Sequence, residues 1–257
     1  MSIFPFLVMF INATRSTPEI QQESISLIPS KFLLENFKIF TGKTFNPLIG
    51  LLNSMIISVC ATLCAIYFSS LTAYGLVAYN WRLRQPFFTF ILIILMIPAQ
   101  VVNIGFYQFM FRLGLTNNFL PLILPAIASP AVVFFMRQYL MSTLSLDIVD
   151  SARIDGSKEF NTFNFIILPI MKPAIATQAI FVFVGSWNNY FLPLIFLTDS
   201  RLYTMPIMVS QLRGDIYRTE FGAIYLGLAL SILPIFVIYF ALSKYIIAGV
   251  QLGGVKE

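Results

Sequence analysis

The sequence has no histidine, only two cysteines and few charged residues. Without histidine there is no imidazole general base, no Ser-His-Asp triad and no imidazole metal ligand. Charged residues make up 11% of the 257 residues, whereas a soluble domain carries roughly 25%. Apolar residues make up 58%. This composition leaves too little polar surface for a soluble domain and indicates an integral membrane protein.

The two cysteines, Cys60 and Cys64, lie four residues apart within an apolar run. That spacing puts both on one face of a helix, where geometry disfavours a disulfide between them. We interpret them as small buried hydrophobic side chains. The net charge of +5 includes no dense basic tract, so nothing supports a nucleic-acid partner. We therefore predict no catalytic residue, no metal site and no cofactor in this chain.

Five apolar segments are each long enough to cross a membrane, which takes about 20 residues. They are Pro47–Tyr79, Phe87–Phe111, Phe119–Met136, Ile166–Leu197 and Phe221–Ile247. None contains Asp or Glu, which argues against a proton-driven carrier. Lys172 lies near one end of the fourth, where its ammonium can reach the lipid headgroups. The pattern predicts an all-α, polytopic bundle that forms a single membrane domain over residues 1–257.

A sixth apolar stretch, Ile3–Ile11, is too short to span a membrane. It is either an interfacial helix or the end of a crossing whose beginning is missing from this sequence. Charge does not settle the orientation, because eight of the 16 Lys and Arg residues would lie on each side. Only the Trp81–Gln85 turn, with two arginines, favours a cytoplasmic location.

Prolines and amides recur inside the spans, which a simple lipid anchor does not need. We take them as signs of a bundle around a polar path. The alternative is hydrogen bonding between helices without a path. The candidate path residues are Gln100, Asn103, Trp187, Asn188 and Asn189.

The polar segment Met141–Asn164 connects the third and fourth spans. Ser145 is a plausible N-cap of a short amphipathic helix with Asp147 in its first turn, and Gly156 permits a sharp break after it. A second short helix follows, and Pro169 then bends the returning span. A short amphipathic helix followed by a sharp turn is suited to docking into a groove of a soluble protein. A helix lying on lipid is the alternative, but it would be richer in Lys and Arg.

The same segment carries a spaced motif. Asp150-Ser151-Ala152 is followed by three residues, Gly156, nine residues and Ile166-Ile167-Leu168-Pro169. This resembles the E-A-A, G, I-x-L-P signature of binding-protein-dependent ABC import permeases, with the same spacing throughout. Asp replaces Glu and Ser replaces Ala, which puts in doubt any exact contact of the first acidic residue.

Other segments are similar to the carbohydrate-uptake group of these permeases. Ala152–Gly156 has its A-R-I-D-G form, and Ser186–Leu194 resembles its W-N-E-[FY] segment with Asn189 at the acidic position. Leu95–Gln100 resembles its M-I-P-x-Q segment. Gly249–Lys256 looks like the tail of the second permease subunit of maltose-type importers. The resemblance covers nearly the whole chain and favours a truncated first crossing.

The resemblance implies a type I ABC importer permease fold of six transmembrane helices, with both termini cytoplasmic, in the bacterial cytoplasmic membrane. It implies four kinds of partner: a second homologous permease subunit, two cytoplasmic ATPase subunits that bind ATP and Mg, an extracytoplasmic solute-binding protein, and membrane lipid. This chain would not be an enzyme. Its ATPase-coupling residues would be Asp150, Ser151, Ala152, Arg153, Asp155, Gly156, Ile166, Leu168 and Pro169.

The implied substrate is an oligosaccharide or a related sugar. A polyol or a glycerol phosphodiester carried by the same machinery is one alternative. An autonomous membrane channel or carrier is the alternative from a different class. The chain alone does not identify the solute, because the binding protein usually selects it.

Overall fold

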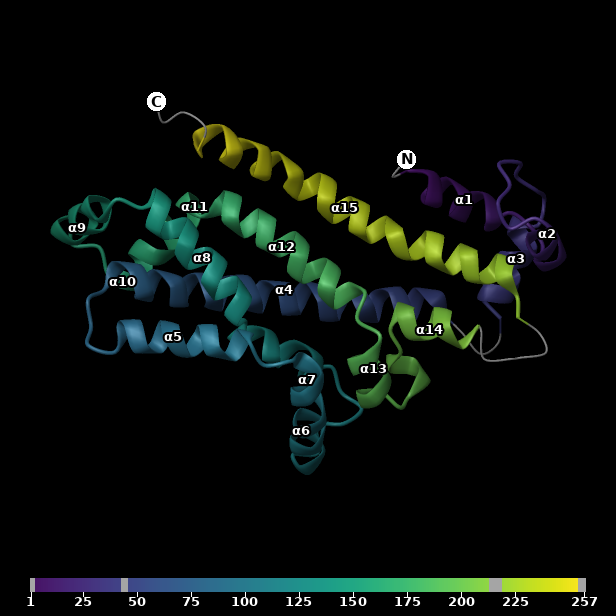
Figure 1. Cartoon of the computed structure of the whole chain (residues 1–257), viewed down its shortest axis with the longest axis horizontal. Coiled ribbons are helices and arrows are strands. Elements are labelled where there is room, and N and C mark those ends of the chain that lie inside the picture. Colours follow the sequence, from purple (N-terminus) through teal and green to yellow (C-terminus); the bar gives the residue numbers. More distant parts are fainter. Residues whose placement is uncertain (1–2, 43–45, 213–218, 254–257) are drawn as a thin grey trace. The chain divides into compact units, whose positions relative to one another are not determined.

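The computed structural model describes residues 3–42, 46–212 and 219–253, and these residues form helices and connecting segments without strands (Figure 1). The longer helices are α4 (Pro47–Ala78), α5 (Arg84–Leu95), α6 (Ala99–Arg112), α8 (Pro130–Thr143), α12 (Lys172–Trp187) and α15 (Phe221–Gly253). The shorter α-helices are α1 (Phe4–Asn12), α2 (Thr17–Gln22), α3 (Leu33–Phe40), α7 (Leu120–Ile123), α9 (Leu146–Ile154), α10 (Glu159–Thr162), α11 (Leu168–Ile170), α13 (Phe191–Phe196) and α14 (Met205–Gln211). The 3-10 turns η1 (Leu124–Ala128) and η3 (Ser200–Leu202) and the π-helical turn η2 (Phe163–Ile167) complete the described elements.

Within the described residues, three helical stretches are long and apolar enough to cross a membrane: Pro47–Ala78, Leu120–Thr143 and Phe221–Tyr245. Two bent pairs pass the same test, so up to five crossings are present if each pair counts as one. These five match the five apolar segments that the sequence predicts. Helix α1 has nine residues and is too short to cross, so the sixth crossing stays a prediction.

Both bent pairs break at proline-containing segments. Helices α5 and α6 meet at 100°, with Pro98 in an extended conformation just before α6. The stretch Glu159–Ile170 meets α12 at 80°, between Pro169 and Pro173. Proline lacks a backbone N–H and disfavours helical geometry in the residue before it. The second bend confirms the predicted kink, and the first lies at Pro98, one of the prolines that recur inside the predicted spans.

The chain forms two compact units. One comprises Met1–Ile56, Thr116–Asn118 and Trp187–Val237, and the other comprises Ile57–Leu115, Phe119–Ser186 and Ile238–Glu257. We call the first the N-terminal unit and the second the motif unit, because it contains the spaced motif. Each has its own buried cluster of apolar side chains.

The core of the motif unit joins α4, α8, α9 and η2. Its fully buried members include Met136, Leu140 and Phe163, and Val149 of α9 packs among them. The Phe163 ring stacks on the ring of Tyr74, with centroids 5.7 Å apart. This aromatic contact fixes the start of the returning span against α4.

The core of the N-terminal unit depends on a close approach at Gly222, near the start of α15. The Nδ2 group of Asn36 donates hydrogen bonds to the backbone oxygens of Ala13 and Arg15, at 2.8 and 2.9 Å. A Cβ at Gly222 would lie 2.4 Å from the Arg15 oxygen and 2.4 Å from Asn36 Nδ2. Only glycine therefore lets α15 meet this hydrogen-bonded junction.

We predict that Gly222→Ala destabilises the protein, because overpacking against backbone typically costs about 1–3 kcal/mol. The melting temperature in detergent should fall. Gly185→Ala is the matched control, since Gly185 also lies in a helix and a Cβ there meets nothing within 4 Å. Equal melting temperatures for the two variants would contradict this account of Gly222.

Candidate functional site

Helix α9 forms the centre of the spaced motif. It begins after Ser145, which has an extended backbone, and it carries Asp147 in its first turn and Arg153 in its last. These charges complement the helix dipole. Ser145 occupies the predicted N-cap position, but its hydroxyl donates to Asp147 Oδ2 at 3.0 Å instead of accepting from a backbone N–H.

The two sides of α9 have different surroundings. Val149 and Ala152 face inward, with 1% and 5% of their surfaces exposed. Leu146, Ile148 and Ile154 are exposed, and Ile154 is 86% exposed. The amphipathic stripe predicted from the sequence is therefore divided. The buried edge anchors α9 in the motif unit, and the exposed apolar side chains are spread around the rest of the helix.

Gly156 ends α9 with a reversal of the chain. Its φ is +80°, a left-handed conformation that residues with a Cβ rarely adopt. Its N–H donates to the Arg153 oxygen at 3.0 Å, and the Ser157 N–H donates to the Ala152 oxygen at 2.9 Å. This pair of bonds is the Schellman arrangement that closes a helix C-terminus. The predicted break at Gly156 is confirmed.

Arg153 connects α9 to the chain beyond that break. Its Nε donates to Glu159 Oε1 at 2.8 Å, and its Nη1 donates to Asp150 Oδ1 at 3.0 Å. The hydrogen bond to Glu159 raises the pKa of the Arg153 guanidinium above its ordinary value, and the bond to Asp150 acts in the same direction. Both carboxylates favour the charged guanidinium.

Glu159 also reaches the end of α4. The hydroxyls of Tyr74 and Tyr79 both donate to Glu159 Oε2, the former at 3.2 Å. The Arg153 guanidinium lies 5.5 Å from the centre of the Tyr79 ring. Sequence analysis missed Glu159 and both tyrosines. Glu159 stands only three residues after Gly156, but no local pattern links it to tyrosines about 80 positions earlier.

The remaining motif residues lie where the chain returns to the bundle. Ile166 and Leu168 are half-buried against the core of the motif unit, and Pro169 is exposed. They belong to the π-helical turn η2 and to α11. Single π-helical turns inside helices are frequent at functional sites. Among the predicted coupling residues in and just after α9, Ala152 is buried, and the others are exposed: Asp150, Ser151, Arg153, Asp155 and Gly156.

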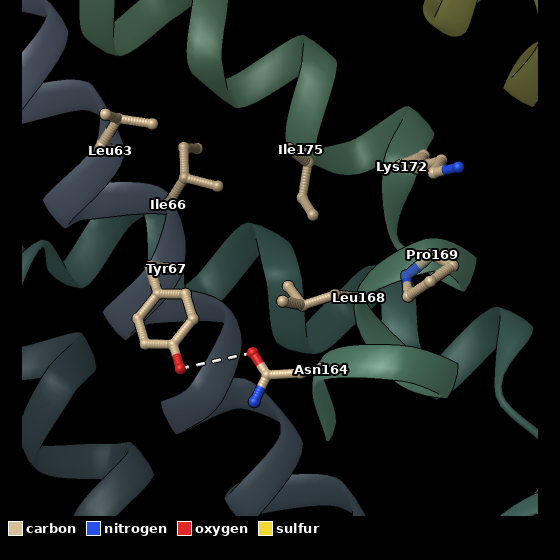
Figure 2. Close-up of a pocket in the computed structure, with 8 residues that line it drawn as sticks. All are labelled: Leu63, Ile66, Tyr67, Asn164, Leu168, Pro169, Lys172 and Ile175. Atoms are coloured by element: carbon tan, nitrogen blue, oxygen red, sulfur yellow. Dashed lines mark hydrogen bonds between the residues drawn. The ribbon is translucent and has the colours of Figure 1, made fainter. Parts of the chain in front are cut away.

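Figure 2 shows a pocket beside Pro169, between α4 and the start of α12. Its volume is about 350 Å³, and its lining is mostly apolar. The Tyr67 hydroxyl donates to Asn164 Oδ1 across one side of it, at 3.4 Å. The ammonium of Lys172 points away from the other lining residues. The motif proline thus borders an open space in the motif unit.

Three candidate path residues lie in the N-terminal unit. The Trp187 side chain is buried, and its Nε1 donates to the Ser231 oxygen at 3.0 Å. Asn188 is exposed and lines a pocket of about 400 Å³. Asn189 Oδ1 accepts from the Leu192 N–H at 3.2 Å. Trp187 borders the same pocket, but only 2% of its surface is exposed.

The other two candidates, Gln100 and Asn103, lie on α6 in the motif unit. Gln100 is exposed, and Asn103 is half-buried. Their membership of a path, like that of the three residues above, stays a prediction.

Comparison with known proteins gives consistent results. Residues 65–251 match the family described as "Binding-protein-dependent transport system inner membrane component". The chain is 36% identical to the arabinooligosaccharides transport system permease protein AraQ of Halalkalibacterium halodurans, over 100% of this chain and 92% of that protein. It is 33% identical to the lactose transport system permease protein LacG of Rhizobium radiobacter, over 100% and 92%.

A third relative, the sn-glycerol-3-phosphate transport system permease protein UgpE of Salmonella typhi, is 31% identical over 96% of this chain and 90% of its own length. Among solved structures, a bacterial ABC transporter involved in the import of the acidic polysaccharide alginate superposes with a TM-score of 0.79 at 21% identity. That match covers 95% of this chain and 90% of the other, and it shows the type I permease fold.

The family match extends over most of the chain and includes α9, Gly156 and the returning span. The relatives match the chain over nearly its full length, and they are permease subunits of ABC transporters rather than enzymes. The chain therefore belongs to the binding-protein-dependent transport system inner membrane components, as an ABC transporter permease of the carbohydrate-uptake group.

Proposed function

We propose that this chain is one of two permease subunits of an ATP-driven importer for an oligosaccharide or a related sugar. Helix α9 docks into a groove of a cytoplasmic ATPase subunit and conveys the closure of the ATPases to the membrane helices. A second ATPase, a homologous permease and an extracytoplasmic solute-binding protein complete the assembly. ATP and Mg bind to the ATPases, and this chain contributes part of the solute path and the helices that move.

The observation that carries this proposal is that α9 buries one edge in its own subunit and leaves its other apolar side chains exposed. A short helix that buries Val149 and Ala152 in its own subunit, while Ile148 and Ile154 remain exposed, has an unfilled apolar contact. A groove that receives the helix would cover these exposed apolar side chains. The exposed Asp150 beside them supplies a polar rim that can fix the register.

The proposal also sets the orientation of the chain in the membrane. If α9 meets a cytoplasmic ATPase, both chain termini lie in the cytoplasm of a bacterial inner membrane. The segments Asn12–Asn46 and Thr198–Glu220 then face outward, towards the binding protein. An autonomous channel or carrier would leave the exposed edge of α9 without a protein partner.

A glycerol phosphate compound is the second candidate solute, because UgpE is among the relatives. The sugar is preferred because two more similar relatives are named for an arabinooligosaccharide and for lactose. The Trp187 ring is buried and offers little surface for stacking on a sugar, as expected if the binding protein selects the solute.

We expect Ile154→Asp to weaken ATPase binding roughly tenfold or more, because full burial of an isoleucine is worth about 1.5–3 kcal/mol. The measurement is the amount of ATPase that co-purifies with the tagged permease. Ile25→Asp is the matched control, since Ile25 is 63% exposed in the segment expected to face outward. Equal ATPase recovery from both variants would count against docking through α9.

We expect Gly156→Ala to reduce ATP-driven uptake several-fold while the partners still assemble, because the left-handed backbone costs a residue with a Cβ roughly 1–2 kcal/mol. Gly114→Ala is the control: Gly114 has φ +69°, and a Cβ there also meets nothing within 4 Å. Uptake is measured in cells that lack the native permease. If both alanine variants import equally well, the turn at Gly156 has no special role.

Competition for uptake will identify the solute class. We expect an unlabelled arabinooligosaccharide or lactose to reduce import of a radiolabelled oligosaccharide, because the more similar relatives are named for sugars. Glycerol 3-phosphate should compete poorly. Strong competition by glycerol 3-phosphate alone would replace the sugar with the second candidate.

A further inference from the structure

The ion pair between Arg153 and Glu159 spans the reversal at Gly156. Arg153 lies in the last turn of α9, and Glu159 is the first residue of α10. Gly156 between them has backbone freedom that other residues lack. A contact that bridges such a glycine restricts the rotation of α9 relative to α10 and the membrane span that follows it.

The two oxygens of the Glu159 carboxylate bind different parts of the motif unit. Oε1 accepts from Arg153 of α9, whereas Oε2 accepts from the hydroxyls of Tyr74 and Tyr79 at the end of α4. Burial and ring contacts hold Tyr74 in place. The Tyr74 side chain is 2% exposed, and its ring contacts the rings of Tyr79 and Phe163 at 5.7 Å each.

The remaining attachment of α9 is apolar. Val149 and Ala152 bury one edge of the helix, and apolar contacts have little directional preference. A helix of nine residues has little stability of its own. The guanidinium of Arg153 and the hydroxyls of Tyr74 and Tyr79 all donate hydrogen bonds to the Glu159 carboxylate. Hydrogen bonds are directional, so they fix the orientation of α9, which the apolar contacts do not.

We propose that Glu159 is a positioning residue that makes α9 move together with the cytoplasmic end of α4. We call its contacts with Arg153, Tyr74 and Tyr79 the Glu159 link. The inference rests on the proposed function, because it assumes that α9 receives motion from an ATPase. With the link intact, closure of the ATPases moves α4. Without it, α9 turns about Gly156, and ATP is hydrolysed with less import.

The Glu159 link orients α9 more than it stabilises the folded protein. Arg153 and Glu159 are about one-third and almost one-half exposed, and exposed ion pairs add little to folding stability. Loss of the link should therefore leave assembly nearly intact and change the number of solute molecules imported per ATP. A purely structural role would lower import and ATP hydrolysis together and leave that ratio unchanged.

The test uses the complete importer in proteoliposomes, with its binding protein and a labelled solute that the wild type imports. We expect Glu159→Gln to lower the ratio of solute imported to ATP hydrolysed roughly fivefold, a typical size for a coupling effect. Tyr79→Phe should lower it less, because Tyr74 still donates to the carboxylate. Tyr139→Phe is the matched control, since its hydroxyl donates to the Ile170 oxygen, outside the link.

Combining substitutions tests whether the residues act as one unit. If they do, Glu159→Gln with Tyr79→Phe is no worse than Glu159→Gln alone, because contacting residues are not additive. An unchanged ratio in Glu159→Gln, or full additivity in the double variant, would overturn the inference while the proposed function stands. Absence of ATP-driven import by the wild type would overturn the proposed function and the inference together.

Discussion

The function of this subunit depends on how α9 is attached to the motif unit, with one edge buried. Val149 and Ala152 anchor the helix in the motif unit, and Ile148 and Ile154 remain on the outside. The helix is too short to persist in water alone, so its orientation comes from this burial, from the turn at Gly156 and from the contacts of Glu159 with Arg153, Tyr74 and Tyr79. Under the proposed function, the exposed edge receives the ATPase, and the attached edge delivers the motion.

The apolar spans fit that division of roles. The five apolar segments of the sequence contain no carboxylate, and the family to which the chain belongs is described as a transport system inner membrane component. In the motif unit, one carboxylate beside α9 joins an arginine and two tyrosines. Prolines bend two of the crossings, and the sharp bend before α12 lies directly after the motif. In our account, the bend is where motion of α9 becomes motion of a membrane helix.

Features with local causes could be predicted from the sequence. The apolar segments, the glycine break and the bend near Pro169 each follow from residues close together in the chain. Features that depend on distant partners could not. The sequence predicts a short amphipathic helix here, but only packing decides that Val149 is buried and Ile148 is exposed. Glu159 was missed because its tyrosine partners lie about 80 residues away, and the burial of Trp187 depends on α15.

Disulfide or short-linker crosslinking tests the central claim, docking of α9 on an ATPase, most directly. Ile148→Cys and Ile154→Cys would be introduced singly into a variant in which Cys60 and Cys64 are replaced by alanine, and the assembled importer would be crosslinked through cysteines placed in the ATPase groove. The account predicts crosslinks to the ATPase from both positions, with yields that change when ATP binds. Crosslinks that form only within the permease, or none at either position, would contradict it.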